Sequence, residues 1–127
     1  MMKFVTTGLV LLSALLAGCS GAPEPISEPL KWEEAVIELQ SQPSPVAVGM
    51  NEFMVVATEE RGRPVRDLVI SLKAANGQWR QAIQDGHSGV YRRALAVAAG
   101  QVEIELKVRR KRTENEAVLI FPIAAAQ

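Results

Sequence analysis

The most constraining feature of this chain is a run of nine residues, Gln101 to Arg109, in which apolar and polar side chains alternate without a break. Val102, Ile104, Leu106 and Val108 fall on one face of an extended chain, and polar residues fall on the other. Such alternation is typical of a β-strand with one face in a core and the other in water. The run therefore predicts an antiparallel sheet with one solvated face.

Other short apolar runs are separated by turn residues at intervals of about 8–12 residues, which is typical of a β-sandwich. Residues 32–40 fit both a helix and a strand, and a strand is favoured because everything after them has β character. Asn76-Gly77 is a strong hairpin signal. The remaining predicted strands are 51–58, 65–73, 78–84, 91–97 and 117–123. The fold expected is all-β, a single immunoglobulin-like antiparallel β-sandwich of about seven strands.

The N-terminal residues form a different kind of segment. Lys3 is followed by an apolar run from Leu9 to Ala17, which is shorter than the roughly 20 residues needed to span a bilayer. This is typical of a secretory signal peptide. The run ends in Leu16-Ala17-Gly18-Cys19, which resembles the bacterial lipobox. The resemblance implies cleavage after Gly18, a diacylglycerol on the Cys19 thiol and acylation, for example by palmitate, of the new amine.

Lipidation would anchor the protein in the cell envelope, because two or more acyl chains hold a protein firmly on a membrane. The next residue is Ser20 rather than Asp. In a Gram-negative source, this favours the periplasmic face of the outer membrane. The expected organisation is a signal peptide over 1–18, lipidated Cys19 with a flexible proline-rich tether over 19–30, and the β-sandwich domain over 31–127.

Composition argues against several classes of function. The 14 basic and 14 acidic residues balance, so no bulk attraction to nucleic acid is expected. One Cys and one His cannot make an internal disulfide or the usual zinc sites. No nucleophile–base pair and no Gly-rich phosphate loop is recognisable, so neither an enzyme nor a bound cofactor is expected.

Four short motifs resemble the YtkA-like and FixH-like extracytoplasmic domains. They are Gly-Met-Asn-Glu-Phe-Met-Val from residue 49, Gly-Arg-Pro-Val-Arg-Asp-Leu-Val-Ile from residue 62, Gly-Val-Tyr from residue 89 and Ala-Gly-Gln-Val-Glu-Ile from residue 99. The resemblance covers residues 45–108 and implies an immunoglobulin-like fold. It gives Gly49, Asn51, Pro64 and Gly89 structural roles at turns and strand starts. Some members of the family accompany copper handling or respiratory oxidase assembly.

The candidate metal ligands are few. Met50, Met54 and His87 together could form a soft copper site, but packing or exposure of the two methionines and a solvated turn at His87 are the favoured interpretations. His87 also lies between Asp85 and Ser88. A Ser-His-Asp triad needs side chains that converge from separate elements, so no triad is expected in this loop.

Two further features have both structural and functional interpretations. Tyr91 follows Gly89 at the start of a predicted strand and resembles a tyrosine corner, whose hydroxyl ties a loop to the sandwich. The basic run Arg109, Arg110, Lys111 and Arg112 could contact anionic lipid or an acidic partner. It could equally form a solvated hairpin tip, which is the favoured interpretation.

The sequence thus predicts a lipid-anchored, non-enzymatic binding or accessory module with a protein partner that the residues do not identify. The alternative is a copper-handling or oxidase-assembly accessory domain of the YtkA/FixH-like type.

Overall fold

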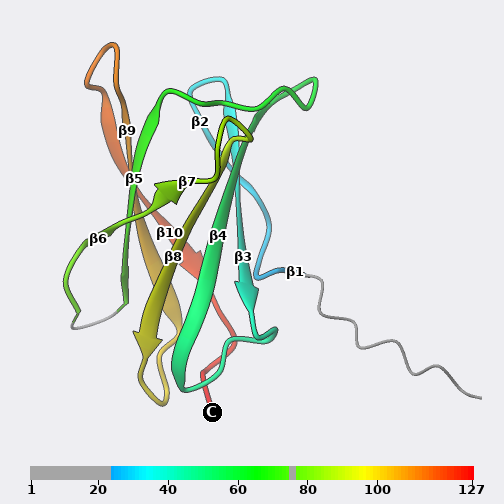
Figure 1. The fold of residues 1–127 in the computed structure, drawn as a ribbon. Helices are drawn as coiled ribbons and strands as arrows, with labels where there is room; N and C mark the ends of the chain where they lie inside the picture. The colour runs from blue at the N-terminus through cyan, green and yellow to red at the C-terminus, as the bar shows by residue number, and fades with distance from the viewer. Residues whose placement is uncertain (1–23, 75–76) are drawn as a thin grey trace, which may run out of the picture.

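The computed structural model describes residues 24–74 and 77–127. The predicted signal peptide and Cys19 lie outside the described residues. The described chain contains no helix and folds into ten strands arranged in two antiparallel sheets (Figure 1). The predicted all-β sandwich is therefore confirmed. Within the described residues, nothing has the form of an apolar helix that could cross a membrane.

The first sheet has the strand order β1-β3-β4-β8-β7, with β2 also paired to β3. Its strands are β1 (Glu24–Pro25), β2 (Leu30–Trp32), β3 (Ala35–Gln42), β4 (Gly49–Glu59), β7 (Ile83–Gln84) and β8 (Val90–Val97). The second sheet has the order β10-β9-β5-β6. Its strands are β5 (Leu68–Ala74), β6 (Arg80–Gln81), β9 (Glu103–Arg110) and β10 (Glu116–Pro122).

The core fills the space between the two sheets with the alternate residues that the sequence pattern assigns to one face. The fully or nearly fully buried side chains include Phe53, Val55 and Ala57 of β4, Leu68, Ile70 and Leu72 of β5, Leu95 and Val97 of β8, and Ile104, Leu106 and Val108 of β9. Residues 32–40, which the sequence leaves open between helix and strand, contribute β3 with Ala35, Ile37 and Leu39 buried. The alternation of these strands is thus the direct cause of the two-layer fold.

The single strand predicted over 78–84 is wrong. The chain forms two short strands there, β6 in the second sheet and β7 in the first. Between them, buried Ala82 donates its N–H to the carbonyl oxygen of Ile70 at 2.8 Å. This bond ties the chain to β5 at the point where it passes from the second sheet to the first. The predicted turn at Asn76-Gly77 falls partly outside the described residues.

The inward position predicted for Val102 is also wrong, because strand β9 begins one residue later. Val102 is exposed, and the neighbouring Gln101 is buried instead. The Gln101 side-chain oxygen accepts the N–H of Ala98, and its amide nitrogen donates to the carbonyl oxygen of Glu103. These bonds turn Gln101 inward and break the alternation at its first step.

Part of the predicted tether is ordered along the edge of the first sheet. Glu24 and Pro25 pair with Ser41 and Gln40 of β3, and the N–H of Ile26 donates to Leu39 at 2.9 Å. Ile26 and Leu30 also pack against the core. A segment without fixed structure over 19–30 is thus a wrong expectation for residues 24–30, because their apolar side chains find a place beside β3.

The two ends of the sandwich differ in composition. The charged end comprises the turn at residues 33–34, the loops 60–67 and 85–89, and the hairpin 111–115. The uncharged end comprises the loops 43–48 and 98–102 and residues 123–127. In Figure 1 the charged end is at the top and the uncharged end, with the C-terminus, is at the bottom. No Asp, Glu, Lys or Arg occurs in the three segments of the uncharged end.

Candidate functional site

The three candidate copper ligands do not come together. Met50 is exposed at the start of β4, whereas His87 lies in the loop before β8, beside the other end of β4. Six residues of strand, about 20 Å at 3.4 Å per residue, separate these two levels of the sheet. Met54 is buried on the outer face of the first sheet, opposite Phe53. Within the described residues, no group of three or more His, Cys, Asp or Glu side chains could hold a metal ion either.

The Asp85–Ser88 loop does not form a catalytic arrangement. The Ser88 hydroxyl donates to the backbone carbonyl of Asp85 at 2.6 Å, and the Asp85 carboxylate pairs with Arg92 at 3.3 Å. His87 is exposed. Both polar neighbours of His87 are thus directed away from it, and the bonds they make close a turn.

The basic run does not form one patch, because its side chains diverge. Arg110 points across the charged end and is only 11% exposed, while Arg112 is 82% exposed and lies 3.4 Å from the carboxylate of Asp67. Lys111 is also exposed. Arg109 pairs in register with Val69 and Glu116 on the half-buried part of β9. The run therefore supplies one structural arginine, one half-buried arginine and two exposed cations.

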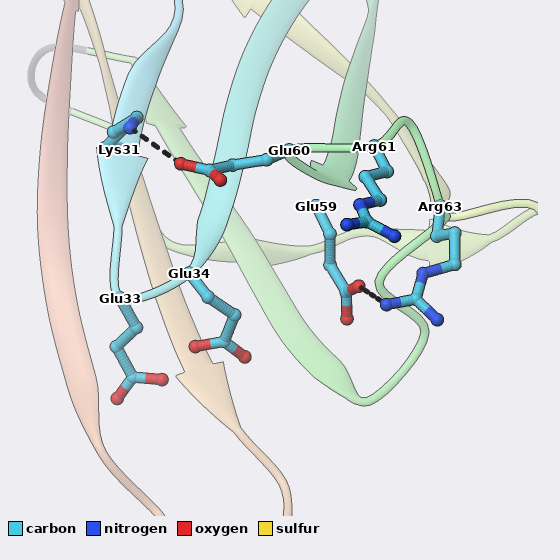
Figure 2. A pocket seen from close by; sticks show the side chains of 7 residues that line it. All are labelled: Lys31, Glu33, Glu34, Glu59, Glu60, Arg61 and Arg63. Carbon is cyan, nitrogen blue, oxygen red and sulfur yellow. Dashed lines mark hydrogen bonds and ion pairs between the residues drawn. The ribbon is translucent and has the colours of Figure 1, made fainter.

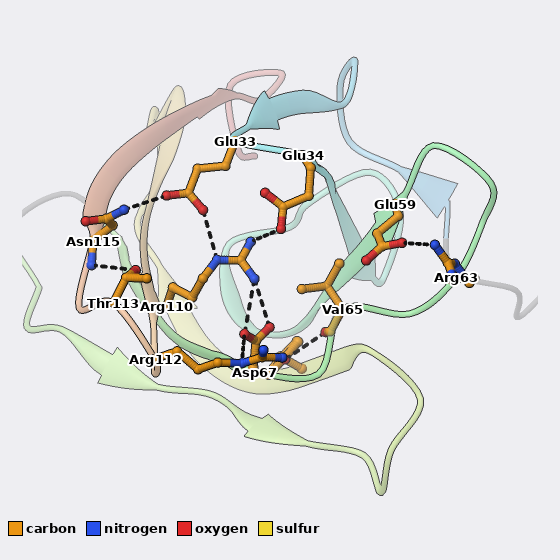
Figure 3. Close-up of polar contacts among 11 residues, drawn as sticks. Glu33, Glu34, Glu59, Arg63, Val65, Asp67, Arg110, Arg112, Thr113 and Asn115 are labelled. Atoms are coloured by element: carbon orange, nitrogen blue, oxygen red, sulfur yellow. Dashed lines mark hydrogen bonds and ion pairs between the residues drawn. The ribbon is translucent and has the colours of Figure 1, made fainter.

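Arg110 is the centre of the most highly connected polar cluster that the structure describes (Figure 3). Its guanidinium nitrogens lie 2.8 Å from Glu33, 2.7 Å from Glu34 and 3.0 Å from Asp67. The contacts to Glu33 and Asp67 are hydrogen bonds, whereas the Nη2 atom facing Glu34 makes an ion pair without hydrogen-bond geometry. One arginine thus joins the β2–β3 turn, the β4–β5 loop and the end of β9.

Two further contacts, made by Asn115 and Trp32, hold the side chains around Arg110 in place. Asn115 donates its side-chain amide to Glu33 at 2.9 Å, and the Arg110 guanidinium lies 5.5 Å from the ring centre of Trp32, within the range of a cation–π contact. The hydrogen bond from Asn115, together with Arg110, lowers the pKa of the Glu33 carboxyl. Burial opposes the charge on Arg110, but its bonds to Glu33 and Asp67 outweigh this and raise its pKa. Both shifts favour the charged forms of Glu33 and Arg110 at neutral pH.

Two residues at the charged end have a backbone conformation that is unusual for residues other than glycine. Glu33 has a φ of 53°, and Glu114 in the β9–β10 hairpin has a φ of 59°. Positive φ is uncommon for residues other than glycine. They are the only such non-glycine residues in the described chain, and both lie at the charged end. In the two-residue β2–β3 turn, this conformation directs the Glu33 carboxylate towards Arg110 and Asn115, whose bonds offset the cost of the backbone.

Two adjoining hollows open beside the cluster. The first, of about 430 Å³, is lined by Lys31, Glu33, Glu34, Glu59, Glu60, Arg61 and Arg63 (Figure 2). The second, of about 420 Å³, shares Glu34 and Glu59 with it and extends along Arg66, Asp67 and Arg110. Two ion pairs border the first hollow, Lys31 with Glu60 at 3.5 Å and Arg63 with Glu59 at 3.0 Å. The surface has both signs of charge in close alternation.

The 60–67 loop, which carries part of this surface, is supported by Tyr91, Gly89 and Pro64. The buried Tyr91 hydroxyl donates to the carbonyl oxygen of Val65 at 3.0 Å, and burial raises the pKa of that hydroxyl. Its acceptor is 26 residues away in the chain, whereas the corner of antibody domains bonds a few residues upstream. Gly89 has a φ of 72°, and a Cβ there would lie 2.8 Å from both Ala57 O and Pro64 Cβ. Only glycine fits this contact.

Gly49 and Asn51 are at the opposite end. Gly49 has a φ of 102°, and the buried Asn51 side chain accepts the Ala47 N–H at 3.0 Å. The same amide donates to the carbonyl oxygens of Ala47 and Gly49, at 2.7 and 3.0 Å. These residues therefore hold the 43–48 loop on β4 and contribute nothing to the charged surface.

The sequence interpretation missed the acidic half of the cluster. Glu33 and Glu34 belong to a segment with two possible interpretations, and Asp67 enters only as one residue of the motif that begins at residue 62. The one local signal is a pair of acidic residues between two apolar runs, which also marks an ordinary turn. The partner of this pair is 77 residues away for Glu33, a separation that no local pattern reveals.

Comparison with known proteins gives no assignment: no protein-family model matches the chain, and neither a curated protein nor a solved structure resembles it significantly.

Proposed function

We propose that this chain is a lipid-anchored, non-enzymatic binding module of the bacterial cell envelope whose charged end receives a protein partner. The observation that carries the proposal is the Leu16-Ala17-Gly18-Cys19 sequence after an apolar run, which has the features of a lipoprotein processing site. On this proposal the mature protein begins at Cys19, is held by its acyl chains and lies in an extracytoplasmic compartment. In a Gram-negative source, Ser20 directs it to the outer membrane.

An immunoglobulin-like topology is part of this proposal. The orders β3-β4-β8-β7 and β10-β9-β5-β6 correspond to the orders A-B-E-D and G-F-C-C′ of that fold. This correspondence, together with the motifs over residues 45–108, supports a relation to the YtkA-like and FixH-like domains. Domains of this architecture commonly present their end loops to partners.

The charged end suits a protein partner better than other classes of ligand. Its two hollows are lined by five acidic and six basic residues, so the surface has no strong net charge to attract nucleic acid or an anionic bilayer. Alternating charges favour a partner whose own charges are complementary, since this arrangement gives specificity and a faster encounter. Arg61 and Arg66, both exposed, are the residues we assign to first contact.

The copper-handling alternative is not favoured by any contact in the described residues. Met50 and His87 are at opposite ends of the sandwich, and Met54 is buried on an outer face. An enzymatic function is likewise not proposed, because the Ser88 hydroxyl bonds to backbone and not to a base.

Lipidation is tested by metabolic labelling with a palmitate analogue in a bacterial host. We predict that the wild type and Ser20→Ala incorporate the label, and that Cys19→Ala remains an unlabelled, uncleaved precursor. Ser20→Ala is the matched control, because it changes the neighbouring residue and leaves the thiol. Label retained in Cys19→Ala, or absent from the wild type, would refute the anchor.

A further inference from the structure

The N-terminal segment joins the sandwich at the uncharged end. The first described residues, Glu24 and Pro25, pair with Ser41 and Gln40, the last part of β3 before the 43–48 loop. Only residues 20–23 separate Glu24 from Cys19. Five residue steps span at most about 18 Å when fully extended. The proposed lipid anchor therefore lies within this distance of the point where β1 meets β3.

This short reach keeps the charged end away from the bilayer. Along β3, the charged end begins near Ala35, which is six residues or about 20 Å from Ser41. The loops 60–67 and 111–115 extend beyond that level (Figure 1). Residues 20–23 cannot bridge this distance and also reach a membrane surface. The bilayer must then face the uncharged end, one of the two sheet faces or the edge beside β1, and that edge exposes the charged residues Glu24, Glu28 and Lys31.

The sheet faces are charged. The outer face of the second sheet carries Lys73 and Glu105, paired at 3.1 Å, and Lys107 beside the ring of Trp79. The outer face of the first sheet carries Glu52 and Arg92, paired at 2.9 Å. Bringing such groups against lipid would remove water from ions, which is costly. Neither face is suited to close contact with a bilayer.

The uncharged end has the opposite character. No Asp, Glu, Lys or Arg occurs in its loops or in the strand residues that lead into them, over residues 39–51, 94–102 and 121–127. Val48 and Val102 are large apolar side chains exposed in its loops, and Met50 is exposed next to them at the start of β4, on the outer face of the first sheet. Alanines and prolines make up most of the remaining loop surface. The nearest charged residues, at the border of this surface, are Glu24, Glu52, Arg93 and Glu103.

The buried polar groups of this end are neutral and satisfied within the loops. Ser41, Asn51 and Gln101 are the buried polar side chains of the described core, and all three lie at this end. Ser41 donates to Pro43 at 3.0 Å, and the two amides bond to the backbone of their own loops. The loops therefore keep their shape without ions, so removing water from the outside of this end leaves no charged side chain unsolvated.

From the anchor position and this chemistry, we infer that the uncharged end, through Val48, Met50 and Val102, lies directly on the phospholipid surface in which Cys19 is anchored. The inference rests on the proposed function, because it needs the lipid on Cys19. The contact is shallow, with apolar side chains at the level of the headgroups. It holds the sandwich upright and presents the charged end away from the membrane, where a protein partner meets it.

The test uses the full, lipidated protein in vesicles of phosphatidylcholine and phosphatidylethanolamine. A fluorophore is attached to a single introduced cysteine in each of four variants: V48C and V102C at the uncharged end, V118C on an outer sheet face and K111C at the charged end. Val48 and Val118 are a matched pair, because they are the same residue type and are 47% and 49% exposed. A spin-labelled lipid headgroup then quenches any fluorophore at the membrane surface.

We expect quenching at positions 48 and 102 to be several-fold stronger than at 118 and 111. Equal quenching at all four positions in protein that floats with the vesicles would overturn the inference while leaving the anchor intact. Positions 48 and 102 shielded from a water-soluble quencher but not quenched by lipid would also overturn it, since a second copy of the chain would then cover this end. Protein that does not float with vesicles would refute the proposed anchor itself.

Discussion

The two ends of this sandwich close their loops over the same core with different chemistry. At the charged end, Arg110 of β9 draws together three carboxylates from two other segments through contacts of 2.7 to 3.0 Å. At the uncharged end, Asn51 and Gln101 fix their loops with neutral hydrogen bonds. Ion pairs depend on pH and salt, whereas neutral amide bonds depend little on either. This difference is consistent with our proposal, in which the charged end faces solvent and a protein partner and the uncharged end loses water against the bilayer.

The largest effect is expected from Arg110→Met, which leaves three carboxylates facing one another around a half-buried site. Removing one partner of a buried ion pair is strongly destabilising; because Glu34 is largely exposed and solvent screens the cluster, we expect a loss of about 2 kcal/mol. Arg112→Met is the matched control, because Arg112 pairs with the same Asp67 but is 82% exposed; its cost should be below about 0.5 kcal/mol. Urea unfolding measures both.

Repeating the urea unfolding at high salt tests whether the cost of Arg110→Met is electrostatic. The cost of Arg110→Met should shrink in about 1 M NaCl, where charges are screened over about 3 Å. Equal costs for the two arginine variants, or a cost for Arg110→Met that salt leaves unchanged, would contradict a cluster held by ion pairs.

A second effect concerns the uncharged end. Asn51→Ala removes the partner of the Ala47 N–H and of two carbonyl oxygens, and we expect a loss of about 1.5 kcal/mol that does not depend on salt. Asn115→Ala is the control, since the exposed Asn115 side-chain amide bonds to the Glu33 carboxylate; its cost should be about 0.5 kcal/mol. An Asn51→Ala variant as stable as the wild type would mean that the 43–48 loop is held by packing alone.

A smaller effect is expected from Tyr91→Phe, which removes a neutral bond from the charged end. The Tyr91 hydroxyl bonds to Val65, and its loss should cost about 1 kcal/mol. Urea unfolding should show a lower midpoint at unchanged slope. An unchanged midpoint would indicate that the β4–β5 loop depends on the Arg110 cluster alone, which would make the contrast between the two ends sharper.

The smallest effect is the pH dependence of Glu33. Because its pKa is lowered below the ordinary value of 4.5, Glu33 contributes stability that is present above that value and is lost as the pH falls through the lowered pKa. The difference in unfolding free energy between wild type and Glu33→Gln should therefore be larger at neutral pH than at about pH 3. Glu28→Gln, at an exposed position, is the control and should show a small difference at both pH values. A Glu33 difference that grows in acid would have the wrong sign.

The sequence predicted the two-layer fold because alternation is local and strong. In β9, Ile104, Leu106 and Val108 are fully buried, as their spacing indicates. The errors arise where a single hydrogen bond decides the course of the backbone or the direction of a side chain. At Ala82 the chain changes sheet. At Gln101 the side chain replaces Val102 in the interior. Residues 24–30 were misjudged because their prolines indicate a tether, although Ile26 and Leu30 can pack beside β3.

The candidate site was less predictable than the fold. The basic run over 109–112 was identified, but its division into one structural arginine and exposed neighbours depends on Glu33, Glu34 and Asp67. These acids are brought to Arg110 by sheet register and by the φ of 53° at Glu33. Neither property is visible in a short sequence window. The contrast in charge between the two ends also becomes apparent only when strand order places the uncharged segments together.

The central claim, that the two ends face a bilayer and its surroundings respectively, is tested most directly by hydrogen–deuterium exchange of the lipidated wild-type protein on and off vesicles. The account predicts slower exchange on vesicles in residues 43–48 and 98–102 and unchanged exchange in residues 60–67 and 111–115. Slower exchange at the charged end, or no change at either end in vesicle-bound protein, would contradict it.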